Sequence, residues 1–271
     1  MERKLYKFSG AGNDFVVIDG REGDVSSFRE VARIEALCRE FRTDGLMILG
    51  SGDAEVDFVM EFYNPDGSGG MMCGNGGRCI VAFADYLGIR PSCHPELAEG
   101  SYLFRAPDGL HTGEILARPE DGLWEVRIKM IDVQGITPML GGYFLNTGTR
   151  HFVKFVDDVE QVDIDTEGKA LRWDPAFAPV GTNVNFVHVA SDGLHVRTFE
   201  KGVEGETLAC GTGLTASAIA ASAAAVIPGE AKESVRLRAR QDWLSVNFTP
   251  GADEKFTDVY LTGPARLVEI R

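Results

Sequence analysis

Short runs in which apolar residues alternate with polar ones recur along most of the chain, and this alternation predicts strands. Successive side chains of a strand point to opposite faces, so alternation among β-branched and aromatic residues is typical of half-buried antiparallel strands. Turn-forming sequences such as Pro107-Asp108-Gly109 and Asp192-Gly193 separate several of the runs. The predicted strands are Asp14–Asp19, Gly45–Leu49, Val56–Tyr63, Leu123–Met130, Asn183–Ala190, Leu194–Phe199, Val235–Arg240, Leu244–Phe248 and Ala265–Ile270.

Three segments show the spacing of helices instead. Ser26–Phe41 starts at a serine that can cap a helix, and Asn75–Leu87 ends just before Gly88. Thr212–Val226 stops ahead of Pro228-Gly229 and consists mostly of Ala and Ser, whose small side chains let a sheet approach on several sides. The pattern predicts an α/β (α+β) protein with two similar halves that meet near residues 115–120. Each half is a curved, mostly antiparallel sheet wrapped around one central helix, and both helix N-termini are expected to face the cleft between the halves.

Two short segments at these helix starts match each other. Met72–Arg78 and Ala209–Thr215 each place a cysteine, Cys73 or Cys210, just before Gly-polar-Gly. A helix N-terminus presents backbone N–H groups and the positive end of the dipole, which favour a thiolate and also bind a carboxylate. Two such elements facing each other would hold one carboxylate between two sulfurs. That arrangement is suited to moving a proton from one face of a carbon to the other.

The other three cysteines carry no such signal. Free cysteine usually behaves as a small buried hydrophobe. Cys38 lies in an apolar helical pattern and Cys79 on the apolar side of its helix, so both are assigned to packing. Cys93 lies in a Pro-rich stretch, Pro91–Gly100, which is predicted to be a surface loop, and its neighbour His94 does not complete a metal site.

Composition narrows the classes of partner. The chain has 271 residues, 44% of them hydrophobic and 25% charged, as in a soluble globular protein. Its net charge of −14 repels nucleic acid and anionic membrane surfaces, so neither is an expected partner. The N-terminus lacks the apolar core of a signal peptide, and no apolar run is long enough to span a bilayer. Five cysteines without a framework of spacings indicate a cytoplasmic protein with reduced thiols.

Four stretches of the sequence together resemble one known family, the diaminopimelate epimerases. Asn64–Ser68 followed by Met72–Cys79 is similar to the family's first active-site motif, and Glu206–Gly213 is similar to its second. Phe8–Phe15 resembles its N-terminal strand, and Gly181–Phe186 resembles a further strand. The motifs occur in the family's order over nearly the whole chain. The related proline racemases and phenazine-type isomerases do not carry the full set.

The resemblance implies a pseudo-symmetric two-domain fold. The halves would be residues 1–117, carrying Cys73, and 118–262, carrying Cys210, with a last strand at about 263–271 returning to the first. It also implies cofactor-independent interconversion of LL- and meso-diaminopimelate, which serves lysine and cell-wall precursor synthesis. The expected partner is thus a small amino-acid substrate, with no cofactor and no metal. A homodimer is compatible with the resemblance.

The same resemblance implies the roles of individual residues. Cys73 and Cys210 would be a thiolate/thiol pair whose roles reverse with direction. The remaining residues would hold the substrate or adjust the thiols. For His151 alone a structural histidine is the better interpretation, and its place in the Asn146–Val153 segment makes the functional one equally good. Each Asn alone suits a turn or strand-end hydrogen bond, Asn64 above all. Glu200 and His151 would tune the thiols and bind the reacting amine, and the residues implied to contact the substrate are Asn13, Asn64, Gly74, Asn75, Asn183, Glu200, Lys201, Gly211 and Thr212.

Three departures from the family pattern concern substrate recognition. Lys201 stands where the family has Arg, and Lys offers a point charge in place of a planar two-point grip. Thr149 stands where many members have Asn, and residues 42–46 are shorter than the family's glycine-rich loop. The alternative is therefore a two-cysteine racemase or epimerase of another amino or imino acid, followed by a binding protein without catalysis. A metal site fails on ligand spacing, and a redox switch between the two thiols would be a side effect of their proximity.

Overall fold

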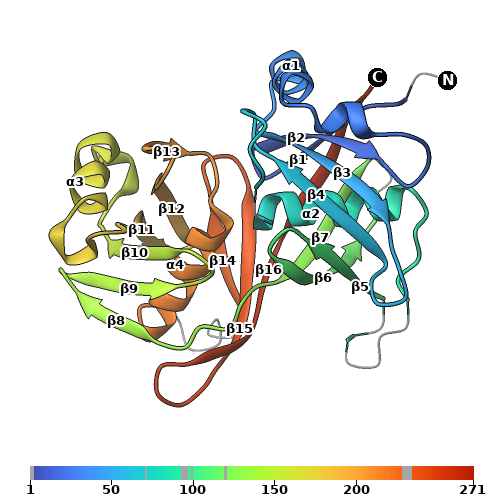
Figure 1. Ribbon diagram of the computed structural model, residues 1–271. Helices are drawn as coiled ribbons and strands as arrows, with labels where there is room; N and C mark the ends of the chain where they lie inside the picture. The colour runs from blue at the N-terminus through green and yellow to red at the C-terminus, as the bar shows by residue number, and fades with distance from the viewer. Residues whose placement is uncertain (1–2, 71, 93–96, 99, 119–120, 228–233) are drawn as a thin grey trace. The chain divides into compact units, whose positions relative to one another are not determined.

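The computed structural model describes residues 3–70, 72–92, 97–98, 100–118, 121–227 and 234–271, and most of its regular structure is β-strand (Figure 1). The chain divides into two compact units. The first is Met1–Ile128 together with Gly263–Arg271, and the second is Lys129–Thr262. The predicted sheet-dominated fold class with few helices is confirmed.

The sheet of the first unit closes on itself. Its strands pair in the order β1 to β7 and then β16, and β16 also pairs with β1. Tyr6 lies opposite Ile270 and Val126 lies opposite Gly263, so the last strand joins the first strand to the seventh. The strands are β1 (Tyr6–Gly10), β2 (Asn13–Asp19), β3 (Gly45–Ser51), β4 (Phe58–Tyr63), β5 (Ser101–Ala106), β6 (Gly109–Ala117), β7 (Leu123–Lys129) and β16 (Phe256–Ile270).

Helix α2 (Gly74–Tyr86) is the central helix of this unit. It packs against β1, β2, β3 and β6, and every residue from Gly74 to Ala84 is buried. Its mixture of Gly, Ala and larger apolar residues suits a helix that is enclosed by strands. The helix follows the predicted Asn75–Leu87 closely and ends before Gly88, which has a φ of +74°.

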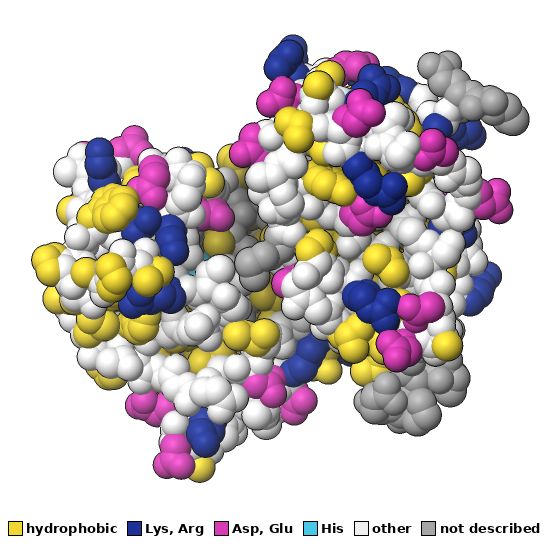
Figure 2. All heavy atoms as spheres, viewed as in Figure 1, with side chains coloured by type: hydrophobic (Ala, Val, Ile, Leu, Met, Phe, Trp, Pro, Cys, Tyr) yellow, Lys and Arg dark blue, Asp and Glu magenta, His cyan; other side chains and the backbone are white. Residues whose placement is uncertain are grey.

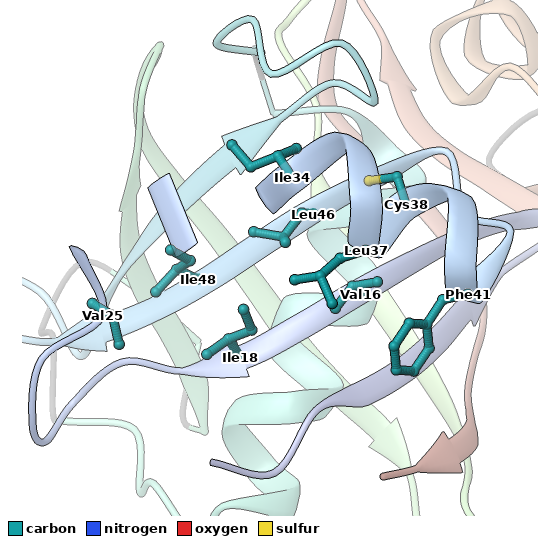
Figure 3. Packing of buried hydrophobic residues seen from close by; sticks show 9 residues of the cluster. All are labelled: Val16, Ile18, Val25, Ile34, Leu37, Cys38, Phe41, Leu46 and Ile48. Atoms are coloured by element: carbon teal, nitrogen blue, oxygen red, sulfur yellow. The ribbon is translucent and has the colours of Figure 1, made fainter. Parts of the chain in front are cut away.

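Helix α1 (Val31–Phe41) covers the other face of β2 and β3. Its buried residues Ile34, Leu37, Cys38 and Phe41 recur every three or four positions and contact Val16, Ile18, Leu46 and Ile48 (Figure 3). The prediction of one helix capped at Ser26 was wrong. Ser26–Arg29 is a short 3₁₀ turn (η1), and Glu30 is extended, so α1 starts only at Val31. The backbone N–H of Ser26 donates to Asp24 at 2.8 Å.

The second unit also surrounds one helix. Its strands pair in the order β8, β9, β10, β11, β12, β14, β15 and the first part of β16, with β13 added beside β12. Among the strand pairs of this unit that the described residues form, β10–β11 and β12–β14 are parallel and the others are antiparallel. The strands are β8 (Ile136–Met139), β9 (Gly142–Asn146), β10 (Arg150–Phe155), β11 (Asn183–Ala190), β12 (Gly193–Glu200), β13 (Gly205–Thr207), β14 (Ser234–Arg238) and β15 (Trp243–Pro250).

Helix α4 (Gly211–Ala223) fills the middle of this unit. It packs against β9, β10, β11, β12, β14 and β15, and its small residues from Ala216 to Ala221 are buried. Short helical turns connect β10 to β11: η2 (Val159–Gln161), η3 (Ile164–Gly168), α3 (Lys169–Arg172) and η4 (Pro175–Phe177). The predicted helix end was too late, since α4 ends at Ala223, and the predicted stop at Pro228-Gly229 lies outside the described residues.

The division into units differs from the sequence-based boundary at 117/118. Strand β7 pairs with β6 on one side and with the last part of β16 on the other, so residues 118–128 belong to the first unit. Strand β16 is also longer than the predicted Ala265–Ile270, because its start at Phe256 pairs with β15 in the second unit. Cys93 and His94, in the predicted loop Pro91–Gly100, lie outside the described residues.

Charged side chains of both signs are interspersed with apolar ones over the face that Figure 2 shows. Among the residues described, no helix has the length and apolar character needed to cross a membrane.

Candidate active site

Cys73 caps the N-terminus of α2, as its motif predicts. Its backbone is extended (φ −107°, ψ 152°), its side chain is exposed, and its Sγ accepts a hydrogen bond from the N–H of Gly76 at 3.3 Å. Upstream, the N–H of Met72 donates to Asp108 Oδ1 at 3.1 Å, which ties this segment to the β5–β6 turn. The sulfur of Cys73 is therefore held at the positive end of the helix dipole.

Asn13 and Asn75 lie together beside this cap. Asn75 Nδ2 donates to Asn13 Oδ1 at 2.5 Å, and Arg78 Nη2 donates to Asn75 Oδ1 at 2.9 Å. Arg78 is fully buried and also donates to the carbonyls of Gly74 and Pro264, each at 3.2 Å. Sequence reasoning missed the role of Arg78, although it ends the motif that marks Cys73. Its guanidinium braces the first turn of α2 from within.

Asn64 lies in a tight turn. Its Nδ2 donates to Ser68 Oγ at 3.0 Å, and its carbonyl accepts from the N–H of Gly67 at 2.9 Å. Gly67 has a φ of +78°, which is why glycine suits this position of the turn. The side chain thus makes the local hydrogen bond that the Asn-Pro-Asp-Gly sequence favours.

Cys210 caps α4 in the second unit, and its surroundings differ from those of Cys73. It is buried, with 8% of its surface exposed, and its backbone is extended (φ −115°, ψ 107°). Its Sγ lies 3.5 Å from Thr212 Oγ1. Thr147 Oγ1 donates to the carbonyl of Thr212 at 2.9 Å and so ties the first turn of α4 to the end of β9. The sulfur of Cys210 therefore faces a hydroxyl group.

His151 lies in the same hydrogen-bonded group. It is fully buried on β10, and its Nε2 lies 2.9 Å from both Thr149 Oγ1 and Thr212 Oγ1. Its Nδ1 lies 3.0 Å from Asn185 Nδ2. Burial lowers the pKa of His151 to about 3, so the ring is neutral near pH 7. The structure thus brings together Cys210, Thr212 and His151, while Asn185 enters as a residue that sequence reasoning did not single out.

Glu200, Asn183 and Lys201 lie around the end of β12. Burial raises the pKa of Glu200, and a hydrogen bond from Thr207 Oγ1 at 2.9 Å acts in the opposite direction. Asn183 Oδ1 accepts from the backbone N–H of Lys201 at 2.8 Å, and its Nδ2 donates to the carbonyl of Arg150 at 2.9 Å. The Lys201 side chain is exposed. Asn183 therefore fixes the backbone from which that cation extends.

Arg172 braces the turn that follows Lys201. It is buried, with 4% of its surface exposed, and its guanidinium lies 4.1 Å from the ring centroid of Trp173. Its Nη2 pairs with Glu204 Oε1 at 3.1 Å, and the same oxygen accepts from the N–H of Gly202 at 3.1 Å. Sequence reasoning missed this brace because nothing in the local pattern relates Arg172 to a turn about thirty residues later.

The two helix starts offer matching chemistry. Each has a sulfur at its cap, followed by backbone N–H groups that, at a helix N-terminus, have no partner within the helix. Such groups bind a carboxylate. A thiol beside them can exchange a proton with the carbon atom that bears this carboxylate. Within the described ranges, no three His, Cys, Asp or Glu side chains are grouped as ligands for a metal ion.

Solved structures share the fold across the whole chain. A phenazine biosynthesis protein of the PhzF family from Bacillus anthracis has a TM-score of 0.73 at 12% identity, covering 100% of this chain and 99% of its own. A hydroxyproline epimerase from Agrobacterium vitis has a TM-score of 0.64 at 16% identity, covering 99% of this chain and 91% of its own. At these identities the likeness shows the fold alone.

Sequence comparison identifies the family. A family model described as diaminopimelate epimerase matches residues 5–106 and 143–268. A diaminopimelate epimerase from Flavobacterium psychrophilum is 38% identical over 269 residues, covering 98% of each chain. Fold and relatives together define an isomerase, and within that class an epimerase. The chain belongs to the diaminopimelate epimerase family, as its motifs predict.

Proposed function

We propose that the protein interconverts LL- and meso-diaminopimelate at one α carbon without a cofactor, in the synthesis of lysine and cell-wall precursors. The observation that carries the proposal is the pair of cysteine caps, Cys73 on α2 and Cys210 on α4, in a chain of this family. The odd number of cysteines suits a reducing cytoplasm, where both thiols stay reduced.

The chemistry requires both thiols to reach the same carbon. One sulfur, as thiolate, takes the α proton, so that the C–H bond breaks and an S–H bond forms. The electron pair spreads into the substrate carboxylate, which we assign to the backbone N–H groups of Gly74, Asn75, Gly211 and Thr212. The other sulfur, as thiol, then returns a proton to the opposite face. The roles exchange when the reaction runs backwards.

The remaining residues hold the substrate in this proposal. Glu200 binds the reacting amine, and Glu200 and His151 adjust the thiols. Asn13, Asn64 and Asn183 contribute amide groups. Lys201 supplies the positive charge for the distal carboxylate. Lys201 stands where the family has an arginine. Because of this difference, the resemblance specifies the distal end of the substrate less than any other part of it.

The proposal is tested by incubating the enzyme with LL-diaminopimelate in D2O, without added cofactor. We expect meso isomer to form with deuterium at the inverted α carbon, because the proton that is returned comes from a thiol that has exchanged with solvent. Inversion that retains the original hydrogen would contradict the two-thiol mechanism. An enzyme that ignores diaminopimelate but epimerises a smaller amino or imino acid would establish the alternative substrate class.

A further inference from the structure

The hydroxyl of Thr212 stands between the sulfur of Cys210 and the ring of His151. It lies 3.5 Å from Cys210 Sγ and 2.9 Å from His151 Nε2. A hydroxyl has one proton to donate, so which neighbour receives it depends on whether Nε2 carries a proton of its own.

The hydrogen bonds of Asn185, on the other side of the ring, determine which nitrogen of His151 carries the proton. Its Nδ2 faces His151 Nδ1 at 3.0 Å and the carbonyl of Phe152 at 3.4 Å, and a carbonyl can only accept. Its Oδ1 accepts from Thr198 Oγ1 at 2.9 Å. The amide group is thereby oriented with its N–H toward Nδ1, and all of these groups are buried. Nδ1 must therefore accept, which leaves the single proton of the neutral ring on Nε2.

We propose that Asn185 and Thr212 are positioning residues for Cys210: Asn185 holds His151 as the neutral Nε2–H tautomer, and Thr212 consequently directs its hydroxyl proton to the sulfur. His151 Nε2–H donates to Thr212 Oγ1, and Thr212 O–H donates to Cys210 Sγ. Thr149 Oγ1 lies 3.1 Å from Thr212 Oγ1 and 2.9 Å from His151 Nε2. In this arrangement the Thr149 hydroxyl donates to Thr212 Oγ1, so the Thr212 proton remains directed to the sulfur. Such a chain of hydrogen bonds stabilises a negative charge at its end.

The inference rests on the proposed function only for its catalytic meaning. When Cys210 takes the α proton of the substrate, the C–H bond breaks, the S–H bond forms and Thr212 keeps its own proton. His151 takes no proton from the sulfur, because its Nε2 already carries one. The low pKa of His151, about 3 as a result of burial, agrees with a ring that stays neutral. Cys73 gains its stabilisation differently, from the backbone N–H of Gly76.

The tautomer is tested by NMR on the full chain labelled with 15N at its five histidines. Long-range 1H–15N spectra distinguish a protonated from an unprotonated ring nitrogen, and His151→Gln assigns the signal. We expect Nε2 of His151 to carry the proton and Nδ1 to be unprotonated. In Asn185→Asp, the carboxylate accepts from Nδ1, so a proton should appear on Nδ1. A wild-type ring protonated on Nδ1 would overturn the proposal.

The effect on the sulfur is tested by the pH dependence of alkylation with iodoacetamide, followed at Cys210 by peptide mass spectrometry. Thr212→Val should move the midpoint of the Cys210 profile upward by about 1 to 2 pH units, the effect of one lost hydrogen bond to a charged group. Thr212→Ser keeps the hydroxyl and should keep the wild-type profile. Thr215→Val is the matched control, because its hydroxyl bonds to the Gly211 carbonyl of the same helix at 2.9 Å.

A Thr212→Val profile that coincides with that of wild type would overturn the proposal, and the Cys73 profile in the same samples serves as an internal reference. Neither measurement needs turnover. Suppose that diaminopimelate is not epimerised, but His151 carries its proton on Nε2 and Thr212→Val raises the midpoint of the Cys210 profile. The proposed function then fails, and the positioning of Cys210 stands. If epimerisation occurs in D2O and both measurements give the opposite results, only the positioning fails.

Discussion

At the scale of single residues, the two cysteine caps are alike in sequence and different in surroundings. Cys73 is exposed, with a backbone N–H at its sulfur, whereas Cys210 is buried, with a hydroxyl at its sulfur. A backbone N–H can only donate, while a hydroxyl can change the direction of its hydrogen bond. The two thiols therefore have separate means of adjustment, although in the proposed mechanism each serves as acid in one direction and as base in the other.

The first prediction concerns these thiols. Cys73→Ala and Cys210→Ala should each abolish epimerisation and leave the fold intact, because each removes the proton carrier for one face of the carbon. Activity and circular dichroism are measured together. Cys38→Ala is the control: Cys38 belongs to the core under α1, and burial raises the pKa of its thiol, so activity should persist. Substantial turnover in either of the first two variants would contradict the mechanism.

A second prediction concerns His151 and acid stability. Burial lowers its pKa from 6.5 to about 3. Between these values the unfolded chain binds a proton that the folded chain excludes, so the contribution of His151 to stability is greatest above pH 6.5 and falls as the pH drops toward 3. The slope is about 1.4 kcal/mol per pH unit.

The measurement is the free energy of unfolding in urea for wild type and His151→Gln. Going from about pH 7 to about pH 5, wild type should lose about 2 kcal/mol more than the variant. Glu200, whose pKa is raised, titrates in both proteins and cancels in the difference. Equal losses in the two proteins would show that His151 binds its proton in the folded state as readily as in the unfolded one.

A third prediction concerns Lys201. If its exposed ammonium meets the distal carboxylate, Lys201→Ala should raise KM for diaminopimelate about ten- to a hundredfold, as expected for one charged hydrogen bond. Initial rates over a range of substrate concentrations measure it. Lys201→Arg should retain binding, and Lys255→Ala, at the exposed β15–β16 turn, should behave as wild type. An unchanged KM in Lys201→Ala would place the distal carboxylate elsewhere.

At the scale of elements, the start of α4 is constrained by the side chain it covers. A Cβ added at Gly213 would lie 2.3 Å from Asn185 Oδ1, and Asn185 is itself held by Thr198. Gly213→Ala should therefore destabilise the protein by about 1 to 3 kcal/mol, although alanine is the better helix former. Urea unfolding measures it. Gly205→Ala in β13 is the control, since a Cβ there meets nothing within 4 Å, and a stability loss as large as that of Gly213→Ala would refute the packing argument.

The sequence predicted those elements whose pattern is long and regular. Asn183–Ala190 is strand β11 with the same bounds, and the start of α2 lies within one residue of its prediction. The strands that the pattern did not predict include β5, β6, β8, β9, β10 and β13. Of these, β8 and β9 are short and contain Pro138 or begin at Gly142. The predicted start of helix α1 was too early, because a serine that can cap an α-helix can also begin a 3₁₀ turn. Ser26 begins the 3₁₀ turn η1, which precedes α1.

The candidate site was predictable where a motif marks it, and not where distant residues converge. The cysteine caps follow from local sequence alone. The neighbours of Arg78 and Asn185 come instead from other elements, such as the carbonyl of Pro264 and the ring of His151. From the sequence alone, an asparagine in a strand, such as Asn185, suggests only a hydrogen bond at a strand end. Its contact with His151 becomes evident once the neighbouring strand is placed. Pairings of this kind depend on sheet register, which alternation alone does not determine.

At the scale of the whole molecule, the chain leaves the first unit after Ile128 and returns to it at Gly263. The returning strand pairs with both β1 and β7, and the carbonyl of Pro264 accepts from the buried Arg78. Without that strand, two rows of backbone hydrogen bonds and a buried guanidinium would lose partners. The second unit is continuous from Lys129 to Thr262 and contains all of its own sheet.

Fragments of the chain test this division. Residues 129–262 should unfold cooperatively in urea by circular dichroism, whereas residues 1–128 should not. Folding of the first unit should return when residues 263–271 are joined by a short Gly/Ser linker ahead of residue 3. The joint is local, because the backbones of Leu5 and Arg271 bond to each other in both directions at 2.8 and 2.9 Å. In this permuted fragment the pH midpoint of Cys73 alkylation should be lower than in residues 1–128 alone, because the N-terminus of α2 favours the thiolate only when the helix is formed. Cooperative unfolding of residues 1–128 alone would show that the returning strand is dispensable.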